Sequence, residues 1–443
     1  MSQILKAIKS ISIRELILLW LAIHLLLITQ PNAAVFDEAY YTKAARDLIQ
    51  GVASNIEHPF LGKAWGAIGI LIFGDNAFGW RIVIVVFGAL LLYTFYQLAC
   101  RYVSERMALL ATAYLGFDHM FFVHSSLFLL EIPALFFAVV SFSYYLKRRI
   151  VLSAVFMGIS ILSKETSLFL LFTMILIHLA NMKMPSKQDV LKALKFTLVL
   201  LATVAVPMQL YISAYRPSAS EKIVQVVSPV VVVAPDGSVL STTTTTTWSS
   251  QKEYISNVFE HWRYIVSYAS SLTTKGSNIG PENFPWNWFI PTQQREMIYY
   301  RSEVVKNITY YSDGVYVGSR LEKLYPINWR GVSNLPLWYS IWVVVPLSIY
   351  LAVKRRLDEG LVLSFLWIVG TYVPLLAMSL ALNRIQYPFY FINTLPALAL
   401  GLPIVFSKLN VDKVVRDCVL AIFLGWTIAS FLIYFPLNIW ALS

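Results

Sequence analysis

Charged residues are scarce in this sequence. Asp, Glu, Lys and Arg together make up 13% of the chain, whereas hydrophobic residues make up 58%. Soluble domains typically carry about 25% charged residues, so the composition excludes an ordinary soluble protein. Apolar runs long enough to cross a bilayer recur along the chain. They indicate an integral, multi-pass membrane protein.

Cysteine is also rare, and acidic residues are fewer than basic ones. Cys100 and Cys418 are the two cysteines, each beside or inside an apolar run, so we expect no structural disulfide. The excess of basic residues leaves a net charge of +11. Because these cations gather in short loops between apolar runs, we assign them to membrane topology and expect no nucleic-acid binding.

Hydropathy predicts an all-α polytopic membrane protein with about eleven transmembrane helices. The predicted spans are 16–30, 80–99, 107–122, 128–146, 150–163, 166–180, 196–214, 336–353, 361–380, 387–406 and 414–435. The first span resembles a signal peptide, but no small-residue cleavage site follows it, so we interpret it as a retained helix. Residues 163–165 separate two short spans, and a broken or re-entrant pair is the alternative there.

The loop charges predict the orientation. With a cytoplasmic N-terminus, every cytoplasmic loop carries at least two cations, as the positive-inside rule requires. We expect a plasma-membrane location, with two long segments outside. The chain then divides into an N-terminal transmembrane module with an outer loop at 31–79, an extracytoplasmic segment and a C-terminal transmembrane module, at 1–214, 215–335 and 336–443.

The extracytoplasmic segment 215–335 is predicted to form a small, partly helical cap. It contains a β-prone run at 230–233 and a turn at 235–237. A run of threonines follows at 242–247. We interpret that run as an exposed strand or linker.

Two adjacent carboxylates, Asp37 and Glu38, follow the first predicted helix. Short amphipathic helices at 42–51 and 63–73 would hold this outer loop along the bilayer surface. Sugar transfer from a lipid phosphate needs a base for the acceptor hydroxyl and cations for the phosphate that leaves. Asp37 or Glu38 could supply the base.

Three cations, Lys63, Arg81 and Arg384, could supply the phosphate site, because each lies at the outer end of a predicted helix. The alternative interpretation is that the two carboxylates cap a helix and the arginines extend to lipid headgroups. Glu131 favours the functional interpretation, since it lies inside an apolar stretch, where an ionisable side chain is costly.

These motifs, taken in order, resemble those of the protein O-mannosyltransferase family within the GT-C membrane glycosyltransferases. The matching residues are Phe36, Asp37 and Glu38; His58, Pro59, Leu61, Gly62 and Lys63; Gly79, Trp80 and Arg81; Leu130, Glu131, Ile132 and Pro133; Ser163 and Lys164; Phe284, Pro285, Trp286, Asn287 and Trp288; and Arg384, Tyr387, Tyr390 and Pro396. Phe60 stands where the family has a second proline.

The resemblance implies a GT-C architecture and a polyprenyl or dolichyl phosphate sugar, usually mannose, as donor. It implies inversion at the anomeric carbon, with Asp37 as base and Glu38 placing donor or acceptor. It also implies Arg81 as a phosphate contact and Glu131 as a second acidic position. The further active-site candidates that it supplies are His58, Lys164, Trp286, Tyr387 and Tyr390.

The acceptor stays open at this point. Protein serine or threonine is the leading acceptor, but relatives of this class also glycosylate lipids and glycans. The eukaryotic members of the family carry a β-trefoil module in the large outer segment, and 215–335 is too short to contain one. The sequence does not predict the oligomeric state.

A divalent metal is a further hypothesis. Asp118, His119, His124 and Glu131 cluster around the second outer loop, but their spacing matches no standard ligand signature. The alternative is a helix cap with interfacial histidines.

A transporter or lipid flippase is the competing class of function. It would place charges along a path at the bilayer midplane. The informative charges gather at one surface instead, and no internal repeat is visible.

Overall fold

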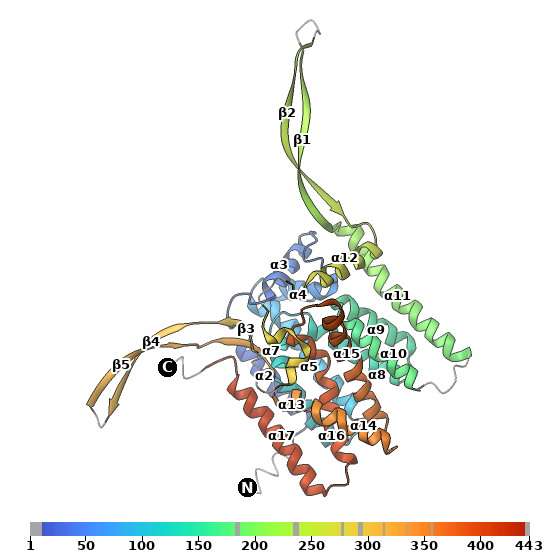
Figure 1. Cartoon of the computed structure of the whole chain (residues 1–443), viewed down its shortest axis with the longest axis vertical. Helices are drawn as coiled ribbons and strands as arrows, with labels where there is room; N and C mark the ends of the chain where they lie inside the picture. Colours follow the sequence, from blue (N-terminus) through green and yellow to red (C-terminus); the bar gives the residue numbers. More distant parts are fainter. Residues whose placement is uncertain are drawn as a thin grey trace.

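The computed structural model describes residues 11–181, 187–233, 239–275, 279–290, 296–312, 315–333, 335–355 and 358–438. A body of packed helices forms the core of the molecule, and two β-hairpins project from it (Figure 1). The helices of the first half are α2 (Ile13–Leu27), α3 (Glu38–Ile49), α4 (Phe60–Phe73), α5 (Ala77–Ala99), α6 (Glu105–Gly116), α7 (His119–Ser126), α8 (Glu131–Leu146), α9 (Ile150–Ser163), α10 (Ser167–Asn181) and α11 (Lys187–Tyr215). Those of the second half are α12 (Val258–Ser271), α13 (Leu335–Tyr339), α14 (Ile341–Val353), α15 (Glu359–Leu382), α16 (Leu395–Lys408) and α17 (Lys413–Ile433), with the 3-10 turns η1 (Pro281–Asn283), η2 (Pro285–Phe289) and η3 (Pro388–Asn393).

Every predicted span overlaps at least one helix, which confirms the predicted polytopic helical fold. By length and composition, five described helices can cross a membrane: Ala77–Ala99, Lys187–Tyr215, Leu335–Val353, Glu359–Leu382 and Lys413–Ile433. The pair α7 and α8 makes a sixth candidate if it is one span, bent by 108°. The other apolar helices are shorter, so helices of full length do not account for the predicted number of about eleven.

Breaks in the helices explain this difference. The predicted span 107–122 was wrong in its bounds, because the helix ends at Gly116 and a new one begins at His119. Asp118 causes the restart: its carboxylate caps α7 by accepting a hydrogen bond from the backbone N–H of Phe121 at 2.9 Å. A hydropathy window averages over such a polar residue and does not detect the break.

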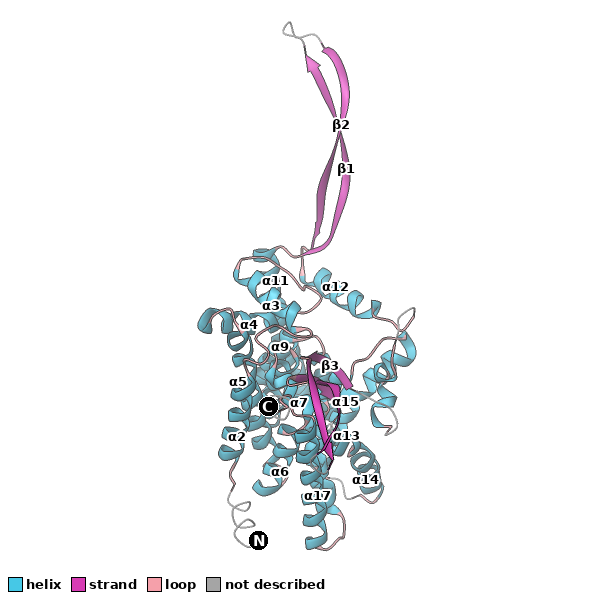
Figure 2. Ribbon diagram, turned by 90° about the vertical axis from the view of Figure 1, so that its left-hand side faces the viewer, coloured by secondary structure: helices cyan, strands magenta, loops and turns pink. Residues whose placement is uncertain are grey.

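The outer segment contains more β-structure than the predicted cap. Strand β1 (Ser218–Val233) pairs antiparallel with β2 (Val239–Tyr254), and β4 (Val304–Ser312) pairs with β5 (Val315–Leu324). A short ladder joins β3 (Glu296–Arg301) to β6 (Asn328–Val332). Figure 2 shows the β1–β2 hairpin extending far beyond the helical body.

The threonine run lies within β2, opposite the valine-rich part of β1. Val226 pairs with Thr247, and Val231 pairs with Thr242. β-Branched residues favour extended backbone, so the expected strand is confirmed. The predicted turn at 235–237 lies outside the described residues.

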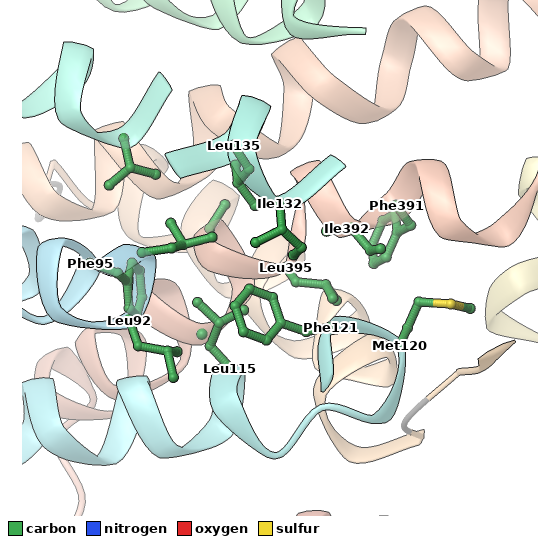
Figure 3. Packing of buried hydrophobic residues seen from close by; sticks show 14 of the residues in the cluster. Leu92, Phe95, Leu115, Met120, Phe121, Ile132, Leu135, Phe391, Ile392 and Leu395 are labelled. Atoms are coloured by element: carbon green, nitrogen blue, oxygen red, sulfur yellow. The ribbon is translucent and has the colours of Figure 1, made fainter. Parts of the chain in front are cut away.

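Helices from both halves of the chain contribute to one hydrophobic core. In Figure 3, Leu92 and Phe95 of α5 and Phe121 of α7 lie close to Ile132 of α8 and Leu395 of α16. The second-half helices therefore pack directly on the first-half helices. This packing brings the loop before α16 next to the loop after α2, and a site can form between them.

Candidate active site

A cavity of about 330 Å³ lies where the segment after α2 meets the α9–α10 junction, α12 and the loop after α15. Its lining residues are Phe36, Asp37, Tyr40, Tyr41, Asn55, Glu57, His58, Lys164, Glu165, Tyr268, Ala269, Leu272, Arg384, Tyr387, Phe389 and Tyr390. Acidic, basic and aromatic side chains thus converge from four parts of the sequence.

Asp37 lines this cavity at the N-terminus of α3. Its side chain makes no capping hydrogen bond to the helix. The alternative interpretation, in which Asp37 caps a helix, is therefore wrong. Burial raises the pKa of the Asp37 carboxyl, and nearby Lys164 opposes that rise. Among the described residues, no side chain forms an ion pair with it. Asp37 is therefore an uncommitted carboxylate facing an open space.

Glu38 has a different environment although it is the next residue. Its side chain is fully buried and forms a two-point ion pair with Arg81, through Nε to Oε1 and Nη2 to Oε2, both at 2.8 Å. The carboxylate also accepts hydrogen bonds from the backbone N–H groups of Val35 at 3.1 Å and Phe128 at 2.7 Å. Every lone-pair direction of Glu38 is used inside the protein.

Arg81 is equally committed. Besides Glu38, its guanidinium donates to the carbonyl oxygens of Ile28, Pro31 and Ala33 at 2.9, 3.0 and 2.9 Å. The side chain is fully buried and does not line the cavity. Arg81 thus stabilises the loop that carries Asp37. It does not reach the cavity, where the predicted contact with a phosphate would have to form.

Lys63 also stabilises the loop and does not line the cavity. Its ammonium donates to the carbonyl oxygens of Asn55 and His58, both at 2.6 Å, and the residue is 2% exposed. The loop 55–58 therefore closes over Lys63, which leaves Arg384 as the one predicted phosphate ligand among the described cavity residues.

Lys164 and Glu131 form a buried ion pair beside the cavity. Lys164 ends α9, and its ammonium contacts one carboxylate oxygen of Glu131. The other oxygen lies 3.4 Å from Nδ1 of His124, whose Nε2 lies 2.9 Å from the hydroxyl of Tyr299. Lys164 itself lines the cavity, 5.8 Å from the centre of the Phe389 ring. Glu131, a predicted active-site candidate, thus does not line the cavity itself but holds Lys164, which does.

His58 pairs with a residue that the sequence analysis did not select. Its Nδ1 lies 2.9 Å from Oε2 of Glu165, and both residues line the cavity. Burial alone would raise the pKa of Glu165, but His58 and Lys164 hold it at about 2. An ionisable pair, Lys164 and Glu165, within a short apolar segment was the signal for this position.

The loop after α15 brings the third group. Asn383 adopts a left-handed conformation (φ 51°) that ends α15. Arg384 then donates from Nε to the carbonyl oxygen of Ala269 at 2.7 Å, and its guanidinium lies 5.6 Å from the Tyr390 ring centre. Tyr387 and Tyr390 both line the cavity, as predicted.

Trp286 does not reach the cavity. It is 39% exposed and stacks on Phe284, with ring centres 5.1 Å apart. Its neighbour Trp288 is fully buried and donates from Nε1 to the carbonyl oxygen of Glu282 at 2.7 Å. The aromatic motif therefore packs the segment onto the helices and leaves the cavity lining to the tyrosines.

The predicted metal candidates point to separate partners. His119 Nε2 lies 2.6 Å from the carbonyl oxygen of Tyr434, whereas His124 contacts Tyr299 and Glu131. Within the described ranges, no three His, Cys, Asp or Glu side chains converge as a metal site would require.

Comparisons with known proteins agree with this architecture. The family model described as dolichyl-phosphate-mannose-protein mannosyltransferase matches residues 57–211. The solved structure of the S. cerevisiae protein O-mannosyltransferase Pmt1-Pmt2 complex bound to the sugar donor aligns with a TM-score of 0.64 and 13% identity, covering 96% of this chain and 89% of that chain. The chain therefore has a GT-C fold, and its residues 57–211 resemble the protein O-mannosyltransferase family. The family resemblance predicted from the sequence motifs is thus confirmed.

Two further relatives extend the comparison of this GT-C chain. A polyprenol-phosphate-mannose–protein mannosyltransferase of Corynebacterium glutamicum is 30% identical over 123 residues, which are 25% of this chain and 24% of the relative. The match thus spans about a quarter of that relative's length. ArnT from Cupriavidus metallidurans, bound to undecaprenyl phosphate, aligns with a TM-score of 0.52 and 13% identity, covering 94% of this chain and 70% of that one.

Proposed function

We propose that this chain is a glycosyltransferase that moves a sugar, mannose, from a polyprenyl or dolichyl phosphate to a hydroxyl of protein serine or threonine. The transfer takes place on the extracytoplasmic side, with inversion. One observation carries the proposal: Asp37 is an uncommitted carboxylate in a cavity that it shares with the cations of Lys164 and Arg384.

The charges of this cavity suit a single displacement. The acceptor oxygen attacks the anomeric carbon while Asp37 takes the hydroxyl proton, and the bond between that carbon and the phosphate oxygen breaks. The phosphate leaves on its lipid, and Lys164 and Arg384 stabilise its negative charge. A positioned base contributes about 10²–10⁴ in rate.

The donor class is supported by the relatives and by the lining. The Pmt1-Pmt2 structure is described as bound to the sugar donor, and the ArnT structure as bound to undecaprenyl phosphate. Tyr40, Tyr41, Tyr268, Tyr387 and Tyr390 surround the cavity. Tyrosine offers an apolar ring for a sugar face together with a hydroxyl for hydrogen bonding.

Asp37 and Glu38 provide a matched pair of variants, because they are adjacent carboxylates with different environments. We expect Asp37→Asn to lower the kcat of mannosyl transfer about 10²–10⁴-fold. Glu38→Gln should instead destabilise the fold by about 3–5 kcal/mol, because it leaves buried Arg81 without its counter-charge. The measurements are transfer from polyprenyl-phosphate mannose to a threonine-rich peptide by reconstituted protein, and thermal unfolding of each variant.

The stability of Asp37→Asn is a control with a definite sign. Because burial raises the pKa of Asp37, the folded protein holds this proton more tightly than the unfolded chain does. The folding stability that this proton provides is therefore present at low pH and is lost as the pH rises through the folded pKa of Asp37. Asp37→Asn should consequently melt no lower than the parent at neutral pH. Full turnover by Asp37→Asn would remove the base assignment.

The acceptor is tested in the same assay. Consumption of the donor with a lipid or glycan acceptor, but with no peptide modified, would keep the transferase and reject the protein acceptor. Absence of transfer with every donor and acceptor would reject the transferase itself.

A further inference from the structure

A second and larger cavity, of about 1150 Å³, lies at the opposite end of the helical body. Its lining includes Ile150, the first residue of α9, and Glu359, the first residue of α15. The candidate active site lies beyond the far ends of the same helices, at Lys164 and Arg384. Helix α15 has 24 residues and is therefore about 36 Å long, with Glu359 of the larger cavity at its start and Arg384 of the candidate active site just after its end.

The lining of this cavity combines apolar side chains with charged ones of both signs. Leu171, Met174 and Phe196 form part of the wall, and the cations are Arg148, Lys192 and Lys195. The lining also contains a polar pair, in which the hydroxyl of Tyr145 lies 2.7 Å from Nδ1 of His178. Cations, a polar pair and apolar side chains are the groups that would contact the phosphate, the glycerol oxygens and the acyl chains of a phospholipid.

Three acidic residues, Asp189, Asp358 and Glu359, also line the cavity, and ion pairs involve the first two. Asp358 pairs with Lys408 at 2.7 Å and caps α15 through the backbone N–H of Leu361. Asp189 pairs with Lys192 at 3.1 Å. Within the described part of the chain, Arg148 and Lys195 form no ion pair with a carboxylate, so these two cations remain for an external anion.

The backbone of Arg148 directs the chain out of α8, as that of Arg216 does after α11 and that of Arg355 after α14. Arg148 follows α8 in the left-handed conformation (φ 57°), and its N–H donates to the carbonyl oxygen of Tyr145 at 2.8 Å. Glycine usually occupies this position after a helix, because a side chain there is strained. The sequence nevertheless has an arginine, and its side chain lines the cavity.

We propose that this cavity binds an anionic phospholipid of the leaflet opposite the candidate active site. The phosphate lies at Arg148 and Lys195, the glycerol oxygens face Tyr145 and His178, and an acyl chain lies against Leu171, Met174 and Phe196. Helix α11 lines one side of the cavity, and only 6% of the apolar stretch of this helix is buried inside the protein. The lipid therefore enters sideways from the bilayer.

Native mass spectrometry of the full-length purified protein tests the site. The protein is delipidated and titrated with phosphatidylglycerol, phosphatidylcholine or diacylglycerol. We expect the double variant Arg148→Gln, Lys195→Gln to lose about tenfold or more in affinity for phosphatidylglycerol, because each cation near a lipid surface contributes measurably. The charge-keeping variant Arg148→Lys, Lys195→Arg should keep the affinity within about twofold.

The control variant removes two exposed cations that do not line the cavity, through Arg106→Gln and Lys413→Gln. It should bind phosphatidylglycerol as the parent does. Ala193→Trp, which narrows the cavity and keeps both cations, should weaken binding. Three results would overturn the proposal: unchanged affinity in the Gln double variant, equal affinity for diacylglycerol and phosphatidylglycerol, or full competition by free glycerol phosphate, which would mean a headgroup-only anion site.

Discussion

At the scale of single residues, adjacent positions have separate tasks. Asp37 faces the cavity, whereas Glu38 turns inward to Arg81 and holds the loop on α5. Lys164 is the link between the buried pairs and the open cavity, because it contacts Glu131 and lies among Tyr41 and Phe389. Its charge also acts on Asp37 and lowers the pKa of that carboxyl against the effect of burial.

This coupling predicts a change in the pH profile of transfer. Removing the cation through Lys164→Gln should raise the pKa of Asp37 further, since burial then acts with less opposition. The base must be ionised, so the acid limb of kcat/KM should move to higher pH, and kcat should also fall because the phosphate loses a ligand. The kcat/KM profile of purified Lys164→Gln measures this shift. An acid limb at the parent's pH would show that Asp37 does not sense Lys164.

At the scale of elements, interrupted helices build the site. The bend of 108° between α7 and α8 places Glu131 at the first position of α8, and the break between α9 and α10 places Lys164 and Glu165 beside it. Continuous helices would bury these charges in the bilayer, where they are costly. The β1–β2 hairpin is a different kind of element, because it projects away from the helices that form the cavity (Figures 1 and 2).

The hairpin should therefore be dispensable for folding and for the cavity. An isolated two-stranded hairpin is at best marginally stable, so it adds little to the stability of the body. Deleting 221–252 and joining Ser220 to Glu253, which are paired in the ladder, through an Asn-Gly turn should leave the melting temperature within about 2 °C. Thermal unfolding and donor binding check this. A large drop in melting temperature would mean that the hairpin packs on something essential.

At the scale of the whole molecule, the two cavities lie at opposite ends of one helical body. The loop charges predict that the active-site end faces outward and the lipid-binding end faces the cytoplasm. Phe259 of α12 is 87% exposed near the first end, and Lys413, at the start of α17, is exposed in a predicted cytoplasmic loop. These positions allow a direct test of orientation.

With Cys100 and Cys418 changed to serine, a cysteine at Phe259 should react with a membrane-impermeant maleimide on intact cells. A cysteine at Lys413 should react only after the membrane is permeabilised. Gel shift of the labelled protein is the readout. The reverse pattern would invert the predicted topology and place the proposed transfer on the cytoplasmic side.

The apolar segments, the carboxylate pair after the first helix and the family resemblance could all be predicted from the sequence, because each is a local pattern along the chain. Which charges remain for chemistry depends on the folded structure. Arg81 and Glu38 are 43 residues apart, and His58 and Glu165 are 107 apart. Whether a cation binds a substrate or a buried carboxylate depends on such distant contacts, and hydropathy and motif spacing carry no information about them. For that reason Arg81 and Lys63 were predicted as phosphate ligands and lie inside the protein, whereas Glu165 was missed and lines the cavity.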